Sequence, residues 1–120
     1  MVGDKSANER FACDQKIIEI EDSMDYLQGK KREIQQLLED FDVDVRRWYS
    51  AMQESNEQVY SKGKEQRQMI QEEMDGIYQF SIQFIDRENE NIAASFGRSI
   101  AIKEEERTEI QRERNNLPWD

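Results

Sequence analysis

The chain has 120 residues, of which 36% are hydrophobic and 37% charged, and its formal net charge is −10. So few apolar residues predict one domain rather than two, and an acidic surface without a basic patch disfavours nucleic acids and anionic membrane surfaces as partners. No apolar run approaches the roughly 20 residues that span a bilayer, so we expect a soluble protein without membrane insertion. The acidic excess is spread over the sequence, since residues 1–60 carry 8 basic and 14 acidic side chains and residues 61–120 carry 9 and 13.

The amino terminus and the cysteine content bear on the compartment. The first residues lack the apolar stretch of a secretory signal, and the single cysteine, Cys13, cannot form an internal disulfide. We therefore expect a cytoplasmic protein, which would use a route independent of a signal peptide if it were secreted with a partner.

Apolar residues recur every seven residues through the first half of the chain. One heptad position holds Ile17, Met24, Leu38, Val45, Met52 and Val59, interrupted only by Lys31, and the other holds Ile20, Leu27, Ile34, Phe41 and Trp48. This pattern is typical of a coiled-coil seam. It predicts a helix from about residue 7 to 60, with Ser6 and Glu9 forming a capping box at its start.

The heptad frame fails after Tyr60, which places a turn at about residues 61–64, where the sequence reads Ser-Lys-Gly-Lys. A turn at residues 55–56 and one uninterrupted helix are the alternatives. A second helix is expected from about 65 to 116, followed by a short tail, because Pro118 cannot continue a helix. Gly76 and Gly97 should weaken this helix, and we expect close helix packing to explain them.

Together these elements predict an all-α fold, an antiparallel two-helix hairpin resembling a coiled coil. Such a hairpin could complete a four-helix bundle with a partner or with a second copy of itself. The whole chain, 1–120, would then be one helical-hairpin domain.

The residues that most catalytic sites need are missing. The chain has no histidine, and its five glycines are scattered singly, so neither a Ser/His/Asp site nor a phosphate-binding glycine loop can form. Residues 40–44 alternate like the start of a calcium loop, but Val45 and Ala51 stand where that loop requires glycine and glutamate. We therefore expect no enzymatic activity, no cofactor and no metal site.

The second helix carries too many apolar groups between residues 77 and 85 for one stripe. At about 100° per residue they fall on two faces, one with Ile77, Phe80 and Phe84 and one with Tyr78, Ile82 and Ile85. A hairpin partner covers only one face, so the other is expected to bind another molecule. The alternative is that the stripe drifts as the helices wrap around each other.

The candidate interface residues are Trp48, Ile77, Phe80, Phe84 and Trp119, since large aromatic and aliphatic side chains dominate binding energies. Trp119 has a second interpretation, as part of a frayed end or a cap over the helices. The partner that we expect is another helical protein, with no nucleic acid and no cofactor involved.

An acidic helical hairpin with a central turn and no signal peptide resembles the small helical-hairpin proteins of bacterial type VII secretion. It is most similar to the accessory proteins that partner LXG-domain toxins. The Trp-x-Gly turn of the family is missing, because Trp48 is followed by Tyr49 and Ser50, and the nearest relative of its Tyr-x-x-x-Asp/Glu signal is Phe84-x-x-x-Glu88. The resemblance implies an adaptor or chaperone that binds the helical targeting domain of a toxin. The alternative function is a self-associating coiled-coil structural protein, in which two copies form a homodimer.

Overall fold

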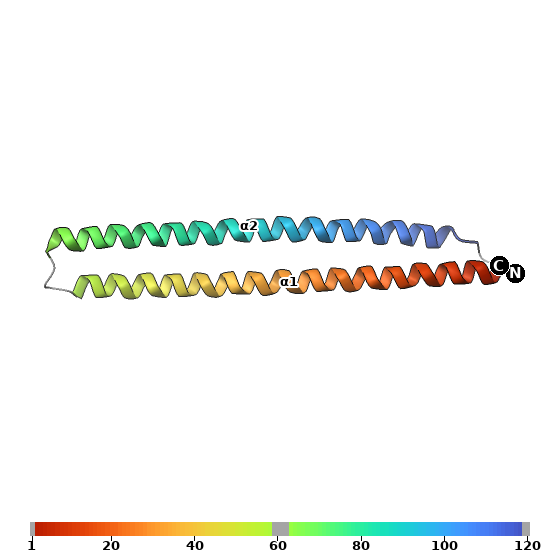
Figure 1. Cartoon of the computed structure of the whole chain (residues 1–120), viewed down its shortest axis with the longest axis horizontal. Helices are drawn as coiled ribbons and strands as arrows, with labels where there is room; N and C mark the ends of the chain where they lie inside the picture. Colours follow the sequence, from red (N-terminus) through yellow and green to blue (C-terminus); the bar gives the residue numbers. More distant parts are fainter. Residues whose placement is uncertain (1, 59–62, 119–120) are drawn as a thin grey trace. The chain divides into compact units, whose positions relative to one another are not determined.

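The computed structural model describes residues 2–58 and 63–118. They form two long helices, α1 (Val2–Gln58) and α2 (Lys64–Asn116), drawn in Figure 1. No strand occurs among the described residues, which confirms the all-α, two-helix prediction. Both alternatives for the middle of the chain are wrong, since residues 55–56 are helical and Gly63 lies outside either helix.

The start of α1 differs from the prediction, because the helix begins at Val2 rather than near Ala7. Ser6 is therefore not a capping residue but lies inside the helix and is buried. The residues before it include no proline, so backbone hydrogen bonds can extend the helix by one more turn and replace the side-chain cap.

A backbone hydrogen bond marks each end of α2. The amide of Arg67 donates to the carbonyl of Gly63 at 3.1 Å, which closes the first turn of the helix. At the other end the amide of Leu117 donates to the carbonyl of Arg114 at 3.2 Å, and Pro118 prevents any continuation. The expected limits of this helix, 65 and 116, agree with the structure to within one residue. The predicted end of α1, at about residue 60, and the first half of the predicted turn, residues 61–62, lie outside the described residues, while Lys64, also predicted in the turn, begins α2.

The chain divides into two compact units, each built from a segment of both helices. Unit 1 comprises Met1–Arg32 with Ala93–Asp120, and unit 2 comprises Glu33–Ile92. Inside unit 1, Ile20 and Met24 are buried. Arginines connect its two helix segments: Arg114 pairs with Asp14, and Arg107 lies 3.8 Å from a carboxylate oxygen of Glu21. These pairs show that the segments run antiparallel.

Inside unit 2, Val45, Met74 and Ile85 form the buried core. Asn56 is also buried, and its side-chain amide donates to the backbone carbonyl of Arg67 at 2.9 Å. Arg46 on α1 contacts Tyr78 on α2. Because the later residue Asn56 contacts the earlier residue Arg67, the segments of unit 2 also run antiparallel.

The seven-residue seam predicted for α1 is wrong at two of its positions in unit 2. Phe41 and Met52 are exposed, whereas Asp42 and Gln53, one residue further on, are partly buried. A straight helix has 3.6 residues per turn, so its inward face moves by about 20° with every heptad. The drift carries Phe41 and Met52 out of the seam to one flank of it.

The explanation expected for Gly76 and Gly97 is also wrong. A β-carbon built on either glycine meets no other atom within 4 Å, so close helix packing does not require them. Both lie within helical backbone, and neither has a positive φ.

Candidate protein interface

One flank of unit 2 carries a network of hydrogen bonds and aromatic rings. Tyr49 on α1 donates to a carboxylate oxygen of Asp75 on α2 at 2.5 Å, and Gln71 donates to the same oxygen at 2.9 Å and to the hydroxyl of Tyr49 at 3.2 Å. The rings of Tyr49 and Tyr78 lie 4.4 Å apart between centroids. Arg46 completes this flank by donating to the hydroxyl of Tyr78 and to Asp42. We call these contacts the polar network.

The polar network affects the ionisation of the Tyr49 hydroxyl. Its hydroxyl donates to Asp75, and a tyrosinate there would lose this hydrogen bond and face a carboxylate. The hydrogen bond, partial burial and the charge of Asp75 therefore raise the pKa of Tyr49. Neutral Tyr49 is thus the form that belongs to the folded state.

The polar network fixes which sides of the two helices meet. Tyr49 and Arg46 lie on one side of the α1 seam, and they contact Asp75 and Tyr78 on the corresponding side of α2. Successive helical residues are about 100° apart, so Trp48 lies on the other side of the seam from Tyr49. The second flank of α1 and the second flank of α2 must therefore share one side of unit 2.

Large apolar side chains occupy this second flank on both helices. On α1 they are Leu37, Phe41, Trp48 and Met52, and on α2 they are Ile77, Phe80 and Phe84. We call these seven residues the apolar strip. The register of the network continues along the helices, so Trp48 lies level with Ile77, and Phe41 lies level with Phe84.

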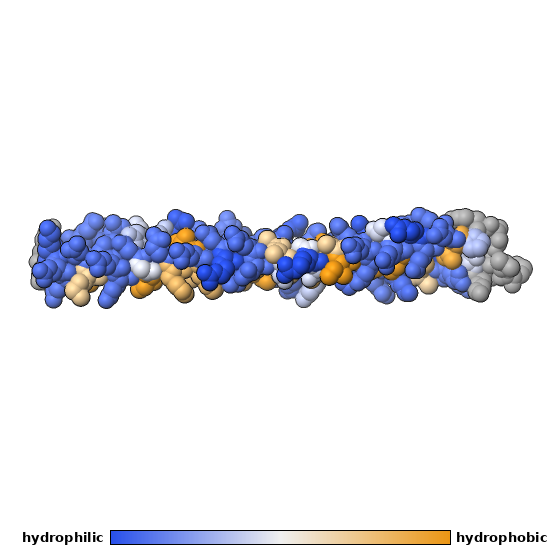
Figure 2. All heavy atoms as spheres, turned by 90° about the horizontal axis from the view of Figure 1, so that it is seen from above, coloured by the Kyte–Doolittle hydropathy of each residue, from blue (hydrophilic) through white to orange (hydrophobic). Residues whose placement is uncertain are grey.

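The apolar strip is largely exposed. Phe80 is 71% exposed, Ile77 53% and Phe84 43%, and of the seven only Trp48 is partly buried. On the other face of α2, Ile85 is buried and Tyr78 and Ile82 are partly buried. The two faces predicted for residues 77–85 are therefore present, and only one of them is covered. In Figure 2, hydrophobic residues reach the surface in patches between hydrophilic ones.

The sequence identified only part of this strip. Trp48, Ile77, Phe80 and Phe84 were candidates, and all four lie on the same side of unit 2; Trp119 lies outside the described residues. Leu37, Phe41 and Met52 were missed, because the heptad frame assigned Phe41 and Met52 to the seam. The spacing of Leu37, Phe41, Trp48 and Met52, at i, i+4, i+11 and i+15, is the signal that could have found them.

Among the residues of unit 1 whose exposure the structure describes, apolar side chains form no such strip. Phe11, Ile18 and Tyr26 lie on α1 and Ile102 on α2. Ile102 is 55% exposed, and its neighbours three and four residues away on the helix are Arg98, Ser99, Glu105 and Glu106. A large exposed apolar surface built from both helices is thus a feature of unit 2.

Formal charge also differs between the units. Unit 2 holds 14 acidic and 6 basic side chains, a formal charge of −8, whereas unit 1 holds 13 and 11, a charge of −2. Although the acidic excess is even along the sequence, the antiparallel pairing collects most of it in the unit that carries the apolar strip.

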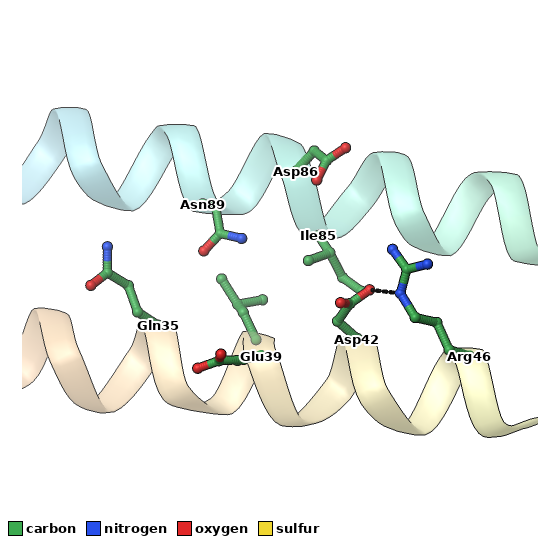
Figure 3. A pocket seen from close by; sticks show the side chains of 8 residues that line it. Gln35, Glu39, Asp42, Arg46, Ile85, Asp86 and Asn89 are labelled. Carbon is green, nitrogen blue, oxygen red and sulfur yellow. Dashed lines mark hydrogen bonds and ion pairs between the residues drawn. The ribbon is translucent and has the colours of Figure 1, made fainter.

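On the polar flank of unit 2, a groove of about 330 Å³ opens beside the Asp42–Arg46 ion pair. Figure 3 shows Gln35, Glu39, Asp42 and Arg46 reaching it from α1, and Ile85, Asp86 and Asn89 from α2. Its walls are mainly carboxylates and amides, a set that offers hydrogen bonds but no nucleophile with an adjacent base.

Comparisons with protein-family models, with curated proteins and with solved structures give no match. Within residues 2–58 and 63–118, no helix is long and apolar enough to cross a membrane. The same residues contain no group of three or more side chains that could hold a metal ion. The apolar strip is therefore the feature from which a function can be argued.

Proposed function

We propose that the protein is a non-enzymatic helical binding protein, which acts as an adaptor or chaperone of a larger helical protein. The observation that carries the proposal is the apolar strip of unit 2, whose aromatic and aliphatic side chains come from both helices and are exposed. Exposed apolar surface of this extent marks interaction sites in soluble proteins.

The strip is well placed to bind a helix. Its side chains form one row on each helix along the same side of unit 2, where a partner helix could pack as a third member of a bundle. Aromatic anchors such as Phe80 and Phe84 would contribute most of the affinity, since full burial of such a side chain contributes about 1.5–3 kcal/mol.

The polar network supports this role because it lies on the opposite flank. It ties α1 to α2 through Tyr49, Asp75 and Tyr78, none of which belongs to the strip. A partner could therefore bind without breaking the contacts that hold the two helices together, and a preformed surface reduces the entropic cost of association.

The resemblance to the accessory proteins of type VII secretion gives the proposal a more specific form. In that form the partner is a helical export substrate such as an LXG-domain toxin, and the complex is assembled in the cytoplasm before delivery to the export machinery. The alternative is self-association of two copies into a four-helix bundle.

Co-expression with the products of the neighbouring genes tests the proposal. We expect the wild type to retain one of them in stoichiometric amounts during affinity purification. A variant with Ile77→Asp and Phe80→Asp should lose it, because two carboxylates would be placed in the apolar strip. The matched control is Ile102→Asp, which makes the same change at an isoleucine of similar exposure outside the strip.

Circular dichroism should show that all three proteins keep their helical content. If no helical partner is retained, or if the strip variant retains it as well as the control does, the proposal is wrong.

A further inference from the structure

Unit 2 combines two surface properties that constrain what can bind there. It carries the apolar strip, and it holds a formal charge of −8 out of the −10 of the whole chain. From this combination we infer that the occupant of the strip is an amphipathic helix with a net positive charge, contributed by a different protein. This inference rests on the proposed function and names the chemistry of the partner.

Carboxylates stand among the apolar side chains of the strip itself. On α1, Asp44 lies between Phe41 and Trp48 at helical spacing, three residues after the first and four before the second. It is exposed.

Acidic residues stand at both ends of the α2 row. Glu73 lies four residues before Ile77, and Glu88 lies four residues after Phe84. Arg87 is the one basic residue between Glu73 and Glu88. A partner that covers the apolar rows therefore brings its own flanking side chains close to several carboxylates, and lysines or arginines there would be favoured while acids would be repelled.

The same charges disfavour a second copy of this chain as the occupant. Two strips packed face to face would bring two units of −8 together, with like charges separated by less than the Debye length of about 8 Å at physiological ionic strength. A basic partner removes this repulsion and is also attracted from a distance, which raises the association rate.

The dimensions of the strip set the length of the partner helix. The α1 row runs from Leu37 to Met52, which corresponds to about 22 Å at 1.5 Å per residue. A helical segment of about 15–18 residues would cover it. Its apolar side chains are expected at i, i+3 or i+4 and i+7, with lysine or arginine on both borders of that stripe.

Two synthetic peptides of about 18 residues are suitable probes for the full-length protein. Both carry the same leucine stripe, but one has lysines on its borders and the other has glutamates. Binding is measured by fluorescence anisotropy of a dye on the peptide and by the emission of Trp48 in a Trp119→Phe background. We expect the basic peptide to bind at least about tenfold more tightly than the acidic one, and to weaken about tenfold between about 0.05 and 0.5 M NaCl.

Two pairs of variants locate the binding. Ile77→Asp with Phe80→Asp should weaken the basic peptide at least about tenfold, whereas Ile102→Asp should leave it unchanged. Replacing Asp44, Glu73 and Glu88 by lysine should reverse the preference between the peptides. The control replaces Glu104, Glu105 and Glu109 by lysine, which changes the net charge equally but in unit 1, and it should keep the preference for the basic peptide.

The opposite outcomes separate this inference from the proposed function. If both peptides bind equally well and the strip variant loses both, the charge inference is wrong while a helix-binding strip stands. If the basic peptide binds the Ile77→Asp, Phe80→Asp variant as tightly as it binds the Ile102→Asp control, it binds elsewhere by non-specific electrostatic attraction, and the inference is wrong. A wild-type dimer in sedimentation that Ile77→Asp with Phe80→Asp converts to a monomer would show that a second copy occupies the strip, and would also overturn it.

Discussion

In unit 1, arginines join the two segments of the chain: Arg114 contacts Asp14, Arg107 contacts Glu21, and Arg10 donates to the backbone carbonyl of Pro118, just beyond α2, at 2.6 Å. In unit 2 the corresponding contacts involve Tyr49, Tyr78, Asn56 and Gln71, with Arg46 as a further donor and Asp75 as an acceptor. The helices are thus joined by ion pairs in unit 1, and in unit 2 by hydrogen bonds and ring contacts in which at least one partner is neutral.

The units also differ in formal charge. Unit 1 holds 11 basic side chains against 13 acidic ones and is close to neutral, whereas unit 2 holds 6 against 14. The two units therefore differ both in how their helices are joined and in the charge that they offer to a partner.

The largest expected effect on the free energy of unfolding comes from truncating a buried side chain in the core of either unit. Ile85→Ala in unit 2 should lower the free energy of unfolding by about 2–4 kcal/mol, because a buried side chain is replaced by a cavity. Met24→Ala is the matched change in unit 1. Hydrogen exchange followed by mass spectrometry should place most of the lost protection of each variant in its own unit. Equal loss in both units would show that the two fold as one cooperative block.

A smaller effect, of opposite sign, is expected at the glycines of α2. Gly76→Ala in unit 2 and Gly97→Ala in unit 1 should each raise the free energy of unfolding by about 0.5–1 kcal/mol, since alanine favours the helix and nothing within 4 Å obstructs its β-carbon. Urea denaturation checks both values. A destabilised variant would mean that the glycine is needed for packing after all.

Salt should distinguish the contacts of the two units. Arg114→Gln removes a partly exposed ion pair of unit 1 and should cost about 0.2–1 kcal/mol at low ionic strength and nearly nothing in about 1 M NaCl. Tyr49→Phe removes hydrogen bonds of unit 2 and should lower the melting temperature by a similar amount at both salt concentrations. A salt-sensitive effect at Tyr49 would contradict the proposed difference between the units.

The smallest effect should appear only in alkali. The pKa of Tyr49 is raised in the folded protein, so its contribution to stability is complete below the pKa of an unfolded tyrosine, about 10, and is lost as the pH rises through the folded value. The melting temperature of the wild type should therefore fall towards that of Tyr49→Phe above pH 10. A constant difference in melting temperature between the two proteins up to about pH 11.5 would contradict this, because it would mean that the pKa of Tyr49 is the same in the folded and the unfolded protein.

Some of this organisation could be predicted from the sequence, and the reasons are local. The heptad of α1 and Pro118 at the end of α2 predicted two paired helices, and the crowding of apolar residues at 77–85 predicted a covered and an uncovered face. These signals need only the geometry of one helix.

The rest depends on how the two helices pair. Phe41 could not be assigned to the strip without knowing how far the seam drifts. The polar network of Tyr49 and Asp75 joins residues 26 positions apart, which no single-helix pattern reveals. The charge difference between the units was hidden for the same reason, because each unit combines residues from both halves of the chain.

Trp48 and Tyr49 are consecutive in α1, yet one belongs to the apolar strip and the other to the polar network. Both surfaces therefore depend on a single rotational phase of the helix. Inserting or deleting one residue upstream within α1 would turn everything beyond it by about 100° relative to the preceding segment, whereas an insertion of seven residues would change that phase by only about 20°. Point substitutions on the outer faces should be tolerated much more readily than changes in helix length, so relatives of this protein should conserve spacing more strictly than side-chain identity.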